Sequence, residues 1–151
     1  MTDCRAVTKG ANTVSMTFDT RIAVVLRDDL ATWQKLNVTA FIVSGIAATI
    51  EDVTGEPYVD RNWNRYLPMF KQPVYVYEAD VAKIRTVFDR ARSREIEFAA
   101  FTENLFATGN DIDNRLVFAS VAEADMDIVG LAFRTDRKVA DKILKGVPFH
   151  P

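Results

Sequence analysis

The sequence is poor in the residues that build disulfides, metal sites and membrane spans. It contains one cysteine, Cys4, and one histidine, His150. A lone cysteine cannot form a disulfide within the chain, which is typical of proteins from a reducing compartment. No apolar run approaches the roughly 20 residues that cross a bilayer, and the N-terminus lacks the basic and apolar segments of an export signal. We therefore expect a cytoplasmic protein with no membrane partner.

Motifs for several common chemistries are absent as well. With one histidine, one cysteine and no pair of carboxylates at ligand spacing, a zinc site or a calcium loop is not expected. The chain has no Gly-rich phosphate-binding loop and no Gly-x-Ser-x-Gly turn that would present a nucleophilic serine. We therefore predict no metal, no cofactor and no cysteine or serine nucleophile.

Neither sign of charge predominates. Nineteen Lys and Arg residues stand against twenty-one Asp and Glu residues, which gives a formal net charge of −2. Such a balance provides no general attraction to the phosphate backbone of nucleic acids. Nucleic acid is therefore not an expected partner.

What the chain does contain is the material for one hydrophobic core. Its 151 residues fit a single domain, and 48% of them are hydrophobic, including ten Phe. This apolar content is enough to offset the conformational entropy lost on folding. Residues 1–17 show no sustained period of 2 or 3.6, so we interpret them as an N-terminal extension. Residues 18–151 are interpreted as one α/β domain.

Apolar runs of strand length alternate with helical patterns along this domain. Strands are predicted at residues 22–26, 73–77, 96–101 and 128–133. The helices between and after them are expected to begin at these caps: Thr32 or Asp29, Asp80, Asn110 or Asp111, and Thr135 or Asp136. Gly146 is the expected left-handed residue after the last helix. The order predicts a three-layer α/β domain with a mixed, mostly parallel four-stranded sheet between helices.

Residues 51–72 interrupt this alternation. Gly55, Pro57, Pro68 and the polar stretch 60–62 indicate turns among Tyr58, Trp63, Tyr66 and Phe70. The pairs 58–59 and 66–67 can form a small hairpin that gives the aromatic rings a defined direction. These rings either stack a planar ligand or pack in the core or between subunits.

Five short runs resemble a known family when they are taken together. The chain is similar to the domain-of-unknown-function family numbered two thousand, DUF2000, from Phe18 to Pro151. The resemblance rests on these runs: Arg27-Asp28-Asp29-Leu30, Trp33-Gln34-Lys35-Leu36-Asn37, Gly55-Glu56-Pro57-Tyr58, Thr108-Gly109-Asn110 and Asp141-Lys142. That family has no assigned activity, so the resemblance implies no reaction.

A more distant resemblance concerns the second type of peptidyl-tRNA hydrolase. Its first strand ends in Arg-x-Asp-Leu before a Gly-Lys at a helix start, and Arg27, Asp29, Leu30 and Lys35 occupy similar places here. The pair Asp141-Lys142 matches its C-terminal helix. This likeness implies a peptidyl-tRNA hydrolase II-like fold with an inserted aromatic hairpin.

The same resemblance does not extend to the hydrolase's chemistry. The hydrolase follows its third strand with an Asp-Ala-Gly turn whose Asp assists catalysis. This chain has Phe101-Thr102-Glu103-Asn104 instead. Within that turn only Glu103 supplies an acid.

Lys35 is the first candidate site residue. It falls in the first turn of a predicted helix, where the positive end of the helix dipole disfavours a cation by roughly 0.3–1 kcal/mol. The same position favours an anionic ligand, which the ammonium group would help to hold. The alternative is a solvated surface lysine.

The other candidates lie where strands end and helices begin, which is where α/β proteins usually bind ligands. We predict Lys35, Thr102 and Glu103 as catalytic residues. The predicted ligand-binding residues are Asn37, Asn104, Thr108, Gly109, Asn110 and Trp63. The alternative reading is structural, since Asn and Gly form turns and Thr, Asn and Asp cap helices. His150, beside the last residue, is read as a frayed or edge-packed terminal group.

Two functional hypotheses follow. The first is a hydrolase or transferase for a small anionic substrate, with Lys35 as electrostatic stabiliser and Glu103 or Thr102 assisting proton transfer. It predicts a cleft that holds the Lys35 amine near residues 102–104. The second is a non-catalytic ligand-binding or homo-oligomeric assembly module, expected to be a dimer, with Trp63 and Phe70 buried between subunits.

Overall fold

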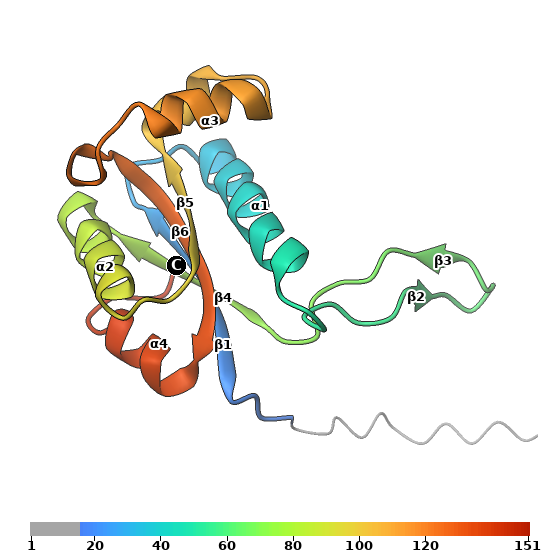
Figure 1. The fold of residues 1–151 in the computed structure, drawn as a ribbon. Helices are drawn as coiled ribbons and strands as arrows, with labels where there is room; N and C mark the ends of the chain where they lie inside the picture. Colours follow the sequence, from blue (N-terminus) through green and yellow to red (C-terminus); the bar gives the residue numbers. More distant parts are fainter. Residues whose placement is uncertain (1–15) are drawn as a thin grey trace, which may run out of the picture.

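The computed structural model describes residues 16–151 (Figure 1). Its strands are β1 (Thr20–Arg27), β2 (Tyr58–Val59), β3 (Arg65–Tyr66), β4 (Val74–Ala79), β5 (Phe98–Thr102) and β6 (Ile128–Asp136). Its α-helices are α1 (Thr32–Thr49), α2 (Val81–Ser93), α3 (Asp111–Ala119) and α4 (Arg137–Ile143). Two short 3₁₀ helices, η1 (Glu103–Ala107) and η2 (Glu123–Asp125), flank α3. The predicted order of strands, hairpin and helices is confirmed.

The main sheet has the strand order β4-β1-β6-β5. β1 pairs with β4 in parallel, and β6 pairs antiparallel with both β1 and β5. The prediction of a mixed four-stranded sheet is therefore confirmed. Three of the four strands, β1, β4 and β5, point the same way, as the prediction of a mostly parallel sheet requires. Most neighbouring strands are nevertheless antiparallel, because β6 lies between β1 and β5 and runs in the opposite direction to both.

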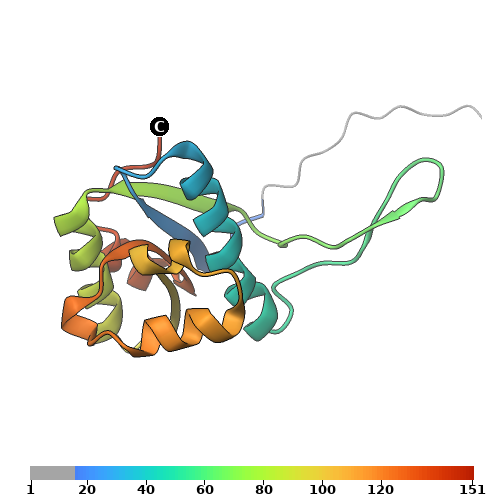
Figure 2. The same ribbon diagram turned by 90° about the horizontal axis from the view of Figure 1, so that it is seen from above.

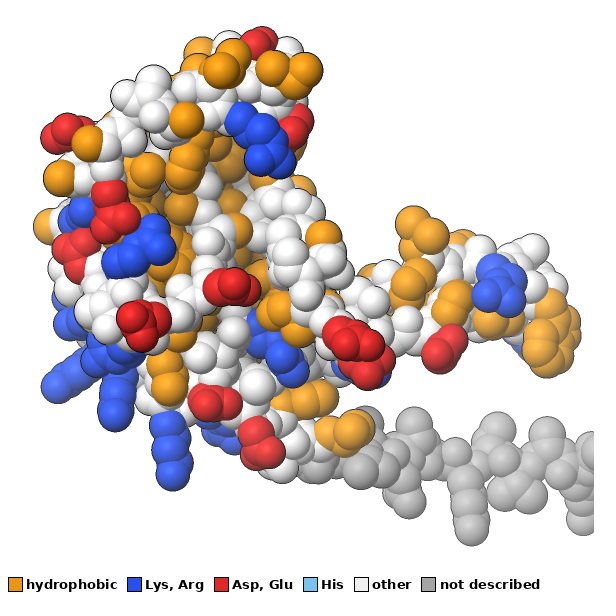
Figure 3. Space-filling view, viewed as in Figure 1, with side chains coloured by type: hydrophobic (Ala, Val, Ile, Leu, Met, Phe, Trp, Pro, Cys, Tyr) orange, Lys and Arg blue, Asp and Glu red, His pale blue; other side chains and the backbone are white. Residues whose placement is uncertain are grey.

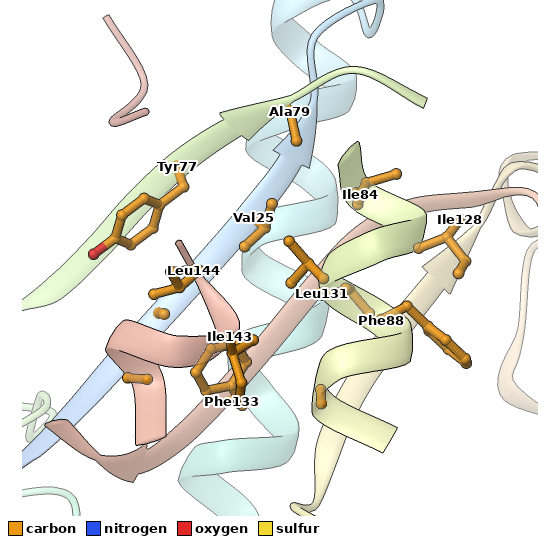
Figure 4. Close-up of a cluster of buried hydrophobic side chains, with 14 residues drawn as sticks. Val25, Tyr77, Ala79, Ile84, Phe88, Ile128, Leu131, Phe133, Ile143 and Leu144 are labelled. Carbon is orange, nitrogen blue, oxygen red and sulfur yellow. The ribbon is translucent and has the colours of Figure 1, made fainter. Parts of the chain in front are cut away.

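Helices cover both faces of this sheet, which makes the three layers (Figures 1 and 2). On one face, α1 packs Val38, Ile42 and Ile46 against the sheet. On the other face, α2 and α4 enclose a second cluster that includes Phe88 and Phe133 (Figure 4). Each central strand is buried on both faces, so its sequence is a continuous apolar run instead of an alternation.

Local sequence sets most helix ends. The Asp80 side chain caps α2 by accepting from the Lys83 N–H, and the Asn110 side chain caps α3 in the same way. α1 differs from prediction: its N-cap is Ala31, whose N–H donates to the Gln34 side chain, and neither Thr32 nor Asp29 serves. Gly146 has the left-handed φ of +78° that was predicted.

A long two-stranded arm, residues 54–70, projects from the body between α1 and β4 (Figures 1 and 2). At its base, Thr54 and Phe70 form an antiparallel bridge, and the Gly55 N–H donates to the Met69 carbonyl at 3.0 Å. Further out, β2 and β3 pair Tyr58 with Tyr66. The predicted hairpin is confirmed, with its second strand shifted by one residue. The residues of the arm beyond its base belong to neither core cluster, as expected of a segment that projects from the body.

Candidate functional site

One edge of the sheet gathers the chain segments that carry most of the predicted site residues. β1, β4 and β5 run in the same direction, so their carboxyl ends meet at this edge, beside the start of β6. α1 begins at the same edge, with four residues between it and the end of β1. Ligands of α/β proteins usually bind at such an edge.

Lys35 lies in the first turn of α1, as predicted, and its side chain forms an ion pair. The Lys35 Nζ atom is 2.7 Å from Glu78 Oε2, near the end of β4. A carboxylate at this place compensates both the ammonium charge and the positive end of the helix dipole. The unfavourable position of a cation at a helix N-terminus is thus explained by a partner 43 positions along the chain.

A C-terminal segment, residues 148–150, adds a further antiparallel partner to the free side of β4. The Glu78 N–H donates to the Pro148 carbonyl at 3.1 Å, and the His150 N–H donates to the Val76 carbonyl at 2.9 Å. The Phe149 ring stacks on Tyr77 with their centroids 4.8 Å apart. This pairing places the His150 imidazole next to Lys35 and Glu78.

The three side chains form a compact group, which we call the Lys35 group. His150 Nε2 lies 3.1 Å from Lys35 Nζ and 3.0 Å from Glu78 Oε2. The three side chains are only 17%, 23% and 28% exposed for Lys35, Glu78 and His150. Ionisable groups that are partly shielded and in mutual contact are the usual material of acid–base sites.

The other ring nitrogen of His150 also faces an oxygen atom. His150 Nδ1 is 2.9 Å from the Pro151 main-chain oxygen, which can only accept, so this contact is a hydrogen bond when Nδ1 carries the proton. In the neutral imidazole, Nε2 then holds a lone pair and accepts a hydrogen bond from Lys35. When the ring is protonated, Nε2 donates to Glu78 instead. Nε2 can therefore accept from Lys35 or donate to Glu78 without a change in the position of the ring.

The charge of Glu78 is stabilised within this group. The hydrogen bond from the Lys35 side chain, together with the positive charge of Lys35, holds the pKa of Glu78 below its ordinary value. Glu78 is therefore ionised at neutral pH, and the pair that it forms with Lys35 is an ion pair.

A second charged group lies at the same edge and is centred on the buried Arg27. Its guanidinium contacts Asp29 at 2.7 Å, Asp127 at 2.5 Å and Glu103 at 3.5 Å. Burial lowers the pKa of Arg27, but the hydrogen bonds to Asp29 and Asp127 outweigh that effect and raise it. Arg27 therefore stays charged and ties the ends of β1, β5 and β6 together. We call these residues the Arg27 group.

Thr102 and Asn104 accompany the Arg27 group. The buried Thr102 hydroxyl donates to Asn104 Oδ1 at 2.6 Å. Together with Glu103, Asp125 and Asp127 they line a cavity of about 230 Å³ that is closed by Phe118, Val121 and Met126. The carboxylates make this cavity acidic, so it does not suit an anionic ligand.

The two groups lie on opposite faces of the sheet. Glu78 pairs in register with Leu26, which packs in the cluster under α1. Arg27 pairs with Ala79, and Thr102 pairs with Ile128, both of which pack in the cluster under α2. Because strand side chains alternate between faces, Glu78 and Thr102 point to opposite faces of the sheet. Glu103 begins η1 and contacts Arg27.

The remaining predicted residues lie elsewhere. Asn37 is on the exposed face of α1. Thr108 donates to the Leu105 carbonyl and to Asn114, Gly109 is exposed, and Asn110 caps α3, so these three shape the turn before α3. Trp63 stands at the tip of the arm and is 85% exposed.

Sequence reasoning did not single out Glu78 as a site residue, and it interpreted His150 as a terminal group. One signal was available: Glu78 is a charged residue within a strand of otherwise apolar and aromatic side chains. Arg27 carried a similar signal, because it closes the apolar run of β1 yet is buried. Buried or strand-embedded charges need partners, and finding those partners would have located both groups.

Residues 16–151 were also searched for two other kinds of site. Within them, no group of three or more His, Cys, Asp and Glu side chains is arranged to hold a metal ion. In the same range, no helix combines the length and apolar character needed to cross a membrane.

Comparison with known proteins identifies the family of the chain. The family described as "Protein of unknown function (DUF2000)" matches residues 20–151, and the chain belongs to this family. A solved structure of the protein of unknown function Atu0240 from Agrobacterium tumefaciens strain C58 is 47% identical to it, with a TM-score of 0.87. The alignment covers 89% of this chain and 100% of that one. Among curated proteins, none matches. The function of the family is unknown, as is that of the solved relative.

Proposed function

We propose that the Lys35 group is an acid–base site of a hydrolase or transferase that acts on a small anionic substrate. The observation that carries this proposal is the mutual contact of Lys35, Glu78 and His150 within 3.1 Å at the carboxyl ends of two parallel strands. The three side chains come from three separate parts of the chain: α1, β4 and residues 148–150. A lysine that is only solvated at the surface would have no such partners.

In this proposal, Lys35 is the electrostatic stabiliser. Without a substrate, Glu78 supplies the negative oxygen that Lys35 and the N-terminus of α1 attract. A carboxylate or phosphate of the substrate takes that place by displacing the Glu78 oxygen from the ammonium group. The free α1 amides of the first turn then add to its attraction.

Proton transfer is assigned to His150. Its Nε2 atom is adjacent to Lys35, and the Nδ1–H tautomer leaves a lone pair there in the neutral ring. That atom can accept a proton from water or from an attacking group and return it to a leaving group. Thr102 and Glu103 were predicted for this role. Because Thr102 is paired with Ile128 on the α2 side of the sheet and Glu103 is engaged by Arg27, the proposal gives the role to His150.

A thermal-shift screen with a panel of carboxylates, phosphates and nucleotides tests this function. A ligand that binds only the folded state raises the melting temperature. We expect at least one small anion to do so for the wild type and not for Lys35→Met. Lys138→Met, which removes an exposed lysine from α4, is the matched control and should keep the shift. An anion whose shift survives Lys35→Met would contradict the proposal.

We also propose the finer fold assignment, a peptidyl-tRNA hydrolase II-like domain. It is supported by the places of Arg27, Asp29 and Lys35 around the end of β1, and by Asp141, which forms a 2.6 Å ion pair with Arg21 to hold α4 on β1. Peptidyl-tRNA hydrolysis is not part of the proposal. The acid after β5, Glu103, is engaged with Arg27, and the chain has no excess of positive charge.

Homo-oligomeric assembly is the second candidate function. The arm favours it, because the rings of Tyr58, Trp63 and Tyr66 are exposed. Hydrophobic side chains gather along the arm in Figure 3. Phe70, also expected at an interface, is half-buried and packs at the base of the arm against the core. Light scattering on the purified chain tests this candidate, and assembly predicts a mass above 17.0 kDa.

A further inference from the structure

The arm is a shaped element that buries almost nothing within its own chain. Six of its apolar side chains are exposed: Tyr58, Val59, Trp63, Tyr66, Leu67 and Met69. A two-stranded hairpin without a surface to pack on is marginally stable in water. Exposed apolar side chains gathered in this way usually mark a contact with another molecule.

The tip of the arm is nevertheless held in a defined shape. Asp60 accepts four hydrogen bonds through its carboxylate, from the N–H groups of Asn62 and Asn64, the Asn64 amide and the Tyr66 hydroxyl. This network brings the chain into the left-handed backbone at Trp63, whose φ is 68°. A tip that already has its bound shape loses less conformational entropy on binding, as expected for a segment that docks on a partner.

A complementary surface lies on α1. This 18-residue helix has one charged residue, Lys35, and that side chain turns away to Glu78. It exposes Trp33, Leu36 and Phe41, and the rings of Trp33 and Phe41 also contact Phe106 and Phe101 edge-on. A surface helix normally carries a charged face, and one that is apolar all round is normally buried. α1 therefore has the composition of a helix that is covered on both sides.

The size of the two surfaces fits a stable dimer. Nine large side chains, six on the arm and three on α1, are each 49–86% exposed. At about 100 Å² each, they offer on the order of 900 Å² of apolar surface. A standard interface takes about 800 Å² from each partner. The depletion of charge on α1 also matches the core of an interface.

The dimensions of the arm and of α1 favour a second copy of the chain as the occupant. The arm points away from its own α1 in both ribbon views, and the side of α1 opposite the sheet is uncovered (Figures 1 and 2). The eight residues from Thr54 to Arg61 reach roughly 27 Å when extended. The 18 residues of α1 are also about 27 Å long, so one arm can cover one helix.

We infer that two copies of this chain form a symmetric dimer in which the arm of each packs on the exposed face of the other's α1. A two-fold axis makes the two contacts identical, so every exposed patch is used once by each copy. This inference rests on the assembly candidate and does not depend on the Lys35 group.

The test uses three charge substitutions in the full chain, followed by light scattering and analytical ultracentrifugation over a concentration series. Trp63→Glu alters the arm, and Leu36→Glu alters the α1 face. Leu116→Glu on α3 is the control, since Leu116 is 66% exposed and Leu36 is 68% exposed. All three positions are exposed, so thermal unfolding should show each variant folded. We expect a dimer for the wild type and Leu116→Glu, and a shift of at least tenfold toward monomer for the other two.

Mixing the two disruptive variants identifies the contact. A mixed dimer of Trp63→Glu and Leu36→Glu keeps one intact arm-on-helix contact, so dimer should reappear on mixing. Failure to recover would overturn the inference, because arm-to-arm or helix-to-helix contacts are broken equally in the mixture. A wild type that stays monomeric would overturn the inference and the assembly candidate together. A dimer that survives both substitutions would overturn only the inference.

Discussion

Lys35 and His150 are 115 positions apart in the chain, yet Lys35 Nζ and His150 Nε2 lie 3.1 Å apart. The contact exists because residues 148–150 return to pair with β4, beside the helix that carries Lys35. It therefore joins the end of the domain to its first βα unit.

Replacing His150 by Ala should loosen the C-terminal segment without unfolding the domain. The substitution removes the ring's contacts with Lys35, Glu78 and Pro151 but leaves the Lys35–Glu78 ion pair. We expect a loss of about 0.5–1 kcal/mol in the free energy of unfolding, the usual range for a partly exposed charged contact. Hydrogen exchange should become faster at the Glu78 and His150 amides. Unchanged exchange at both amides would show that the ring does not hold the segment.

Acid should weaken the contribution of Glu78 to stability. Its pKa is lower in the folded state than its ordinary value of 4.5, mainly because Lys35 donates a hydrogen bond to it. A group of this kind stabilises the fold above its unfolded-state pKa, and the contribution is lost as the pH falls through the lowered folded-state pKa. Urea unfolding of wild type and Glu78→Gln should therefore differ at neutral pH and converge as the pH falls below 4.5. A difference that grows in acid would contradict this assignment.

Gly130→Ala should destabilise the protein by about 1–3 kcal/mol, the usual cost of overpacking. Gly130 lies in β6 beneath α1, and a Cβ atom there would collide with Val38 Cγ1 and lie 3.5 Å from Ile42 Cδ1. Gly109→Ala is the matched control, because nothing lies within 4 Å of its added Cβ. Its effect should stay within about 0.5 kcal/mol. Equal melting temperatures for the two variants would refute the close packing of α1 on β6.

Asp60→Ala should disorder the tip of the arm while leaving the domain intact. The hydrogen bonds from Asn64 and Tyr66 hold the pKa of Asp60 below its ordinary value, so the carboxylate stays charged and the tip stays ordered in mild acid. We expect faster hydrogen exchange at the Asn62 and Asn64 amides and an unchanged melting temperature of the body. If dimerisation uses a pre-shaped arm, the dissociation constant of the dimer should also rise.

The elements of the fold were predictable because they depend on local pattern. The apolar run of β1 and the caps at Asp80 and Asn110 act within a few residues, and each prediction is confirmed. The order in which the strands pair was harder to predict from the sequence. The insertion of β6 between β1 and β5 depends on long-range contacts that a periodic pattern does not encode.

The same distinction applies to the candidate site. Lys35 was recognisable because a cation at a helix N-terminus is locally unfavourable. Its partners were not, since Glu78 is 43 positions away and His150 is brought in by main-chain pairing of a terminal segment. The separation of Lys35 from Thr102 follows from the alternation of strand faces, which requires the register of all four strands.

The contact between Lys35 and His150 can be measured directly, because His150 is the chain's only histidine and its ring signals are unambiguous. Nitrogen-15 NMR of the imidazole in wild type and Lys35→Met reports the tautomer and the hydrogen bond at Nε2. We predict the Nδ1–H tautomer for the neutral ring, with an Nε2 resonance that moves when Lys35 is replaced. An Nε2–H tautomer whose resonances are the same in both proteins would contradict the Lys35 group and the function proposed for it.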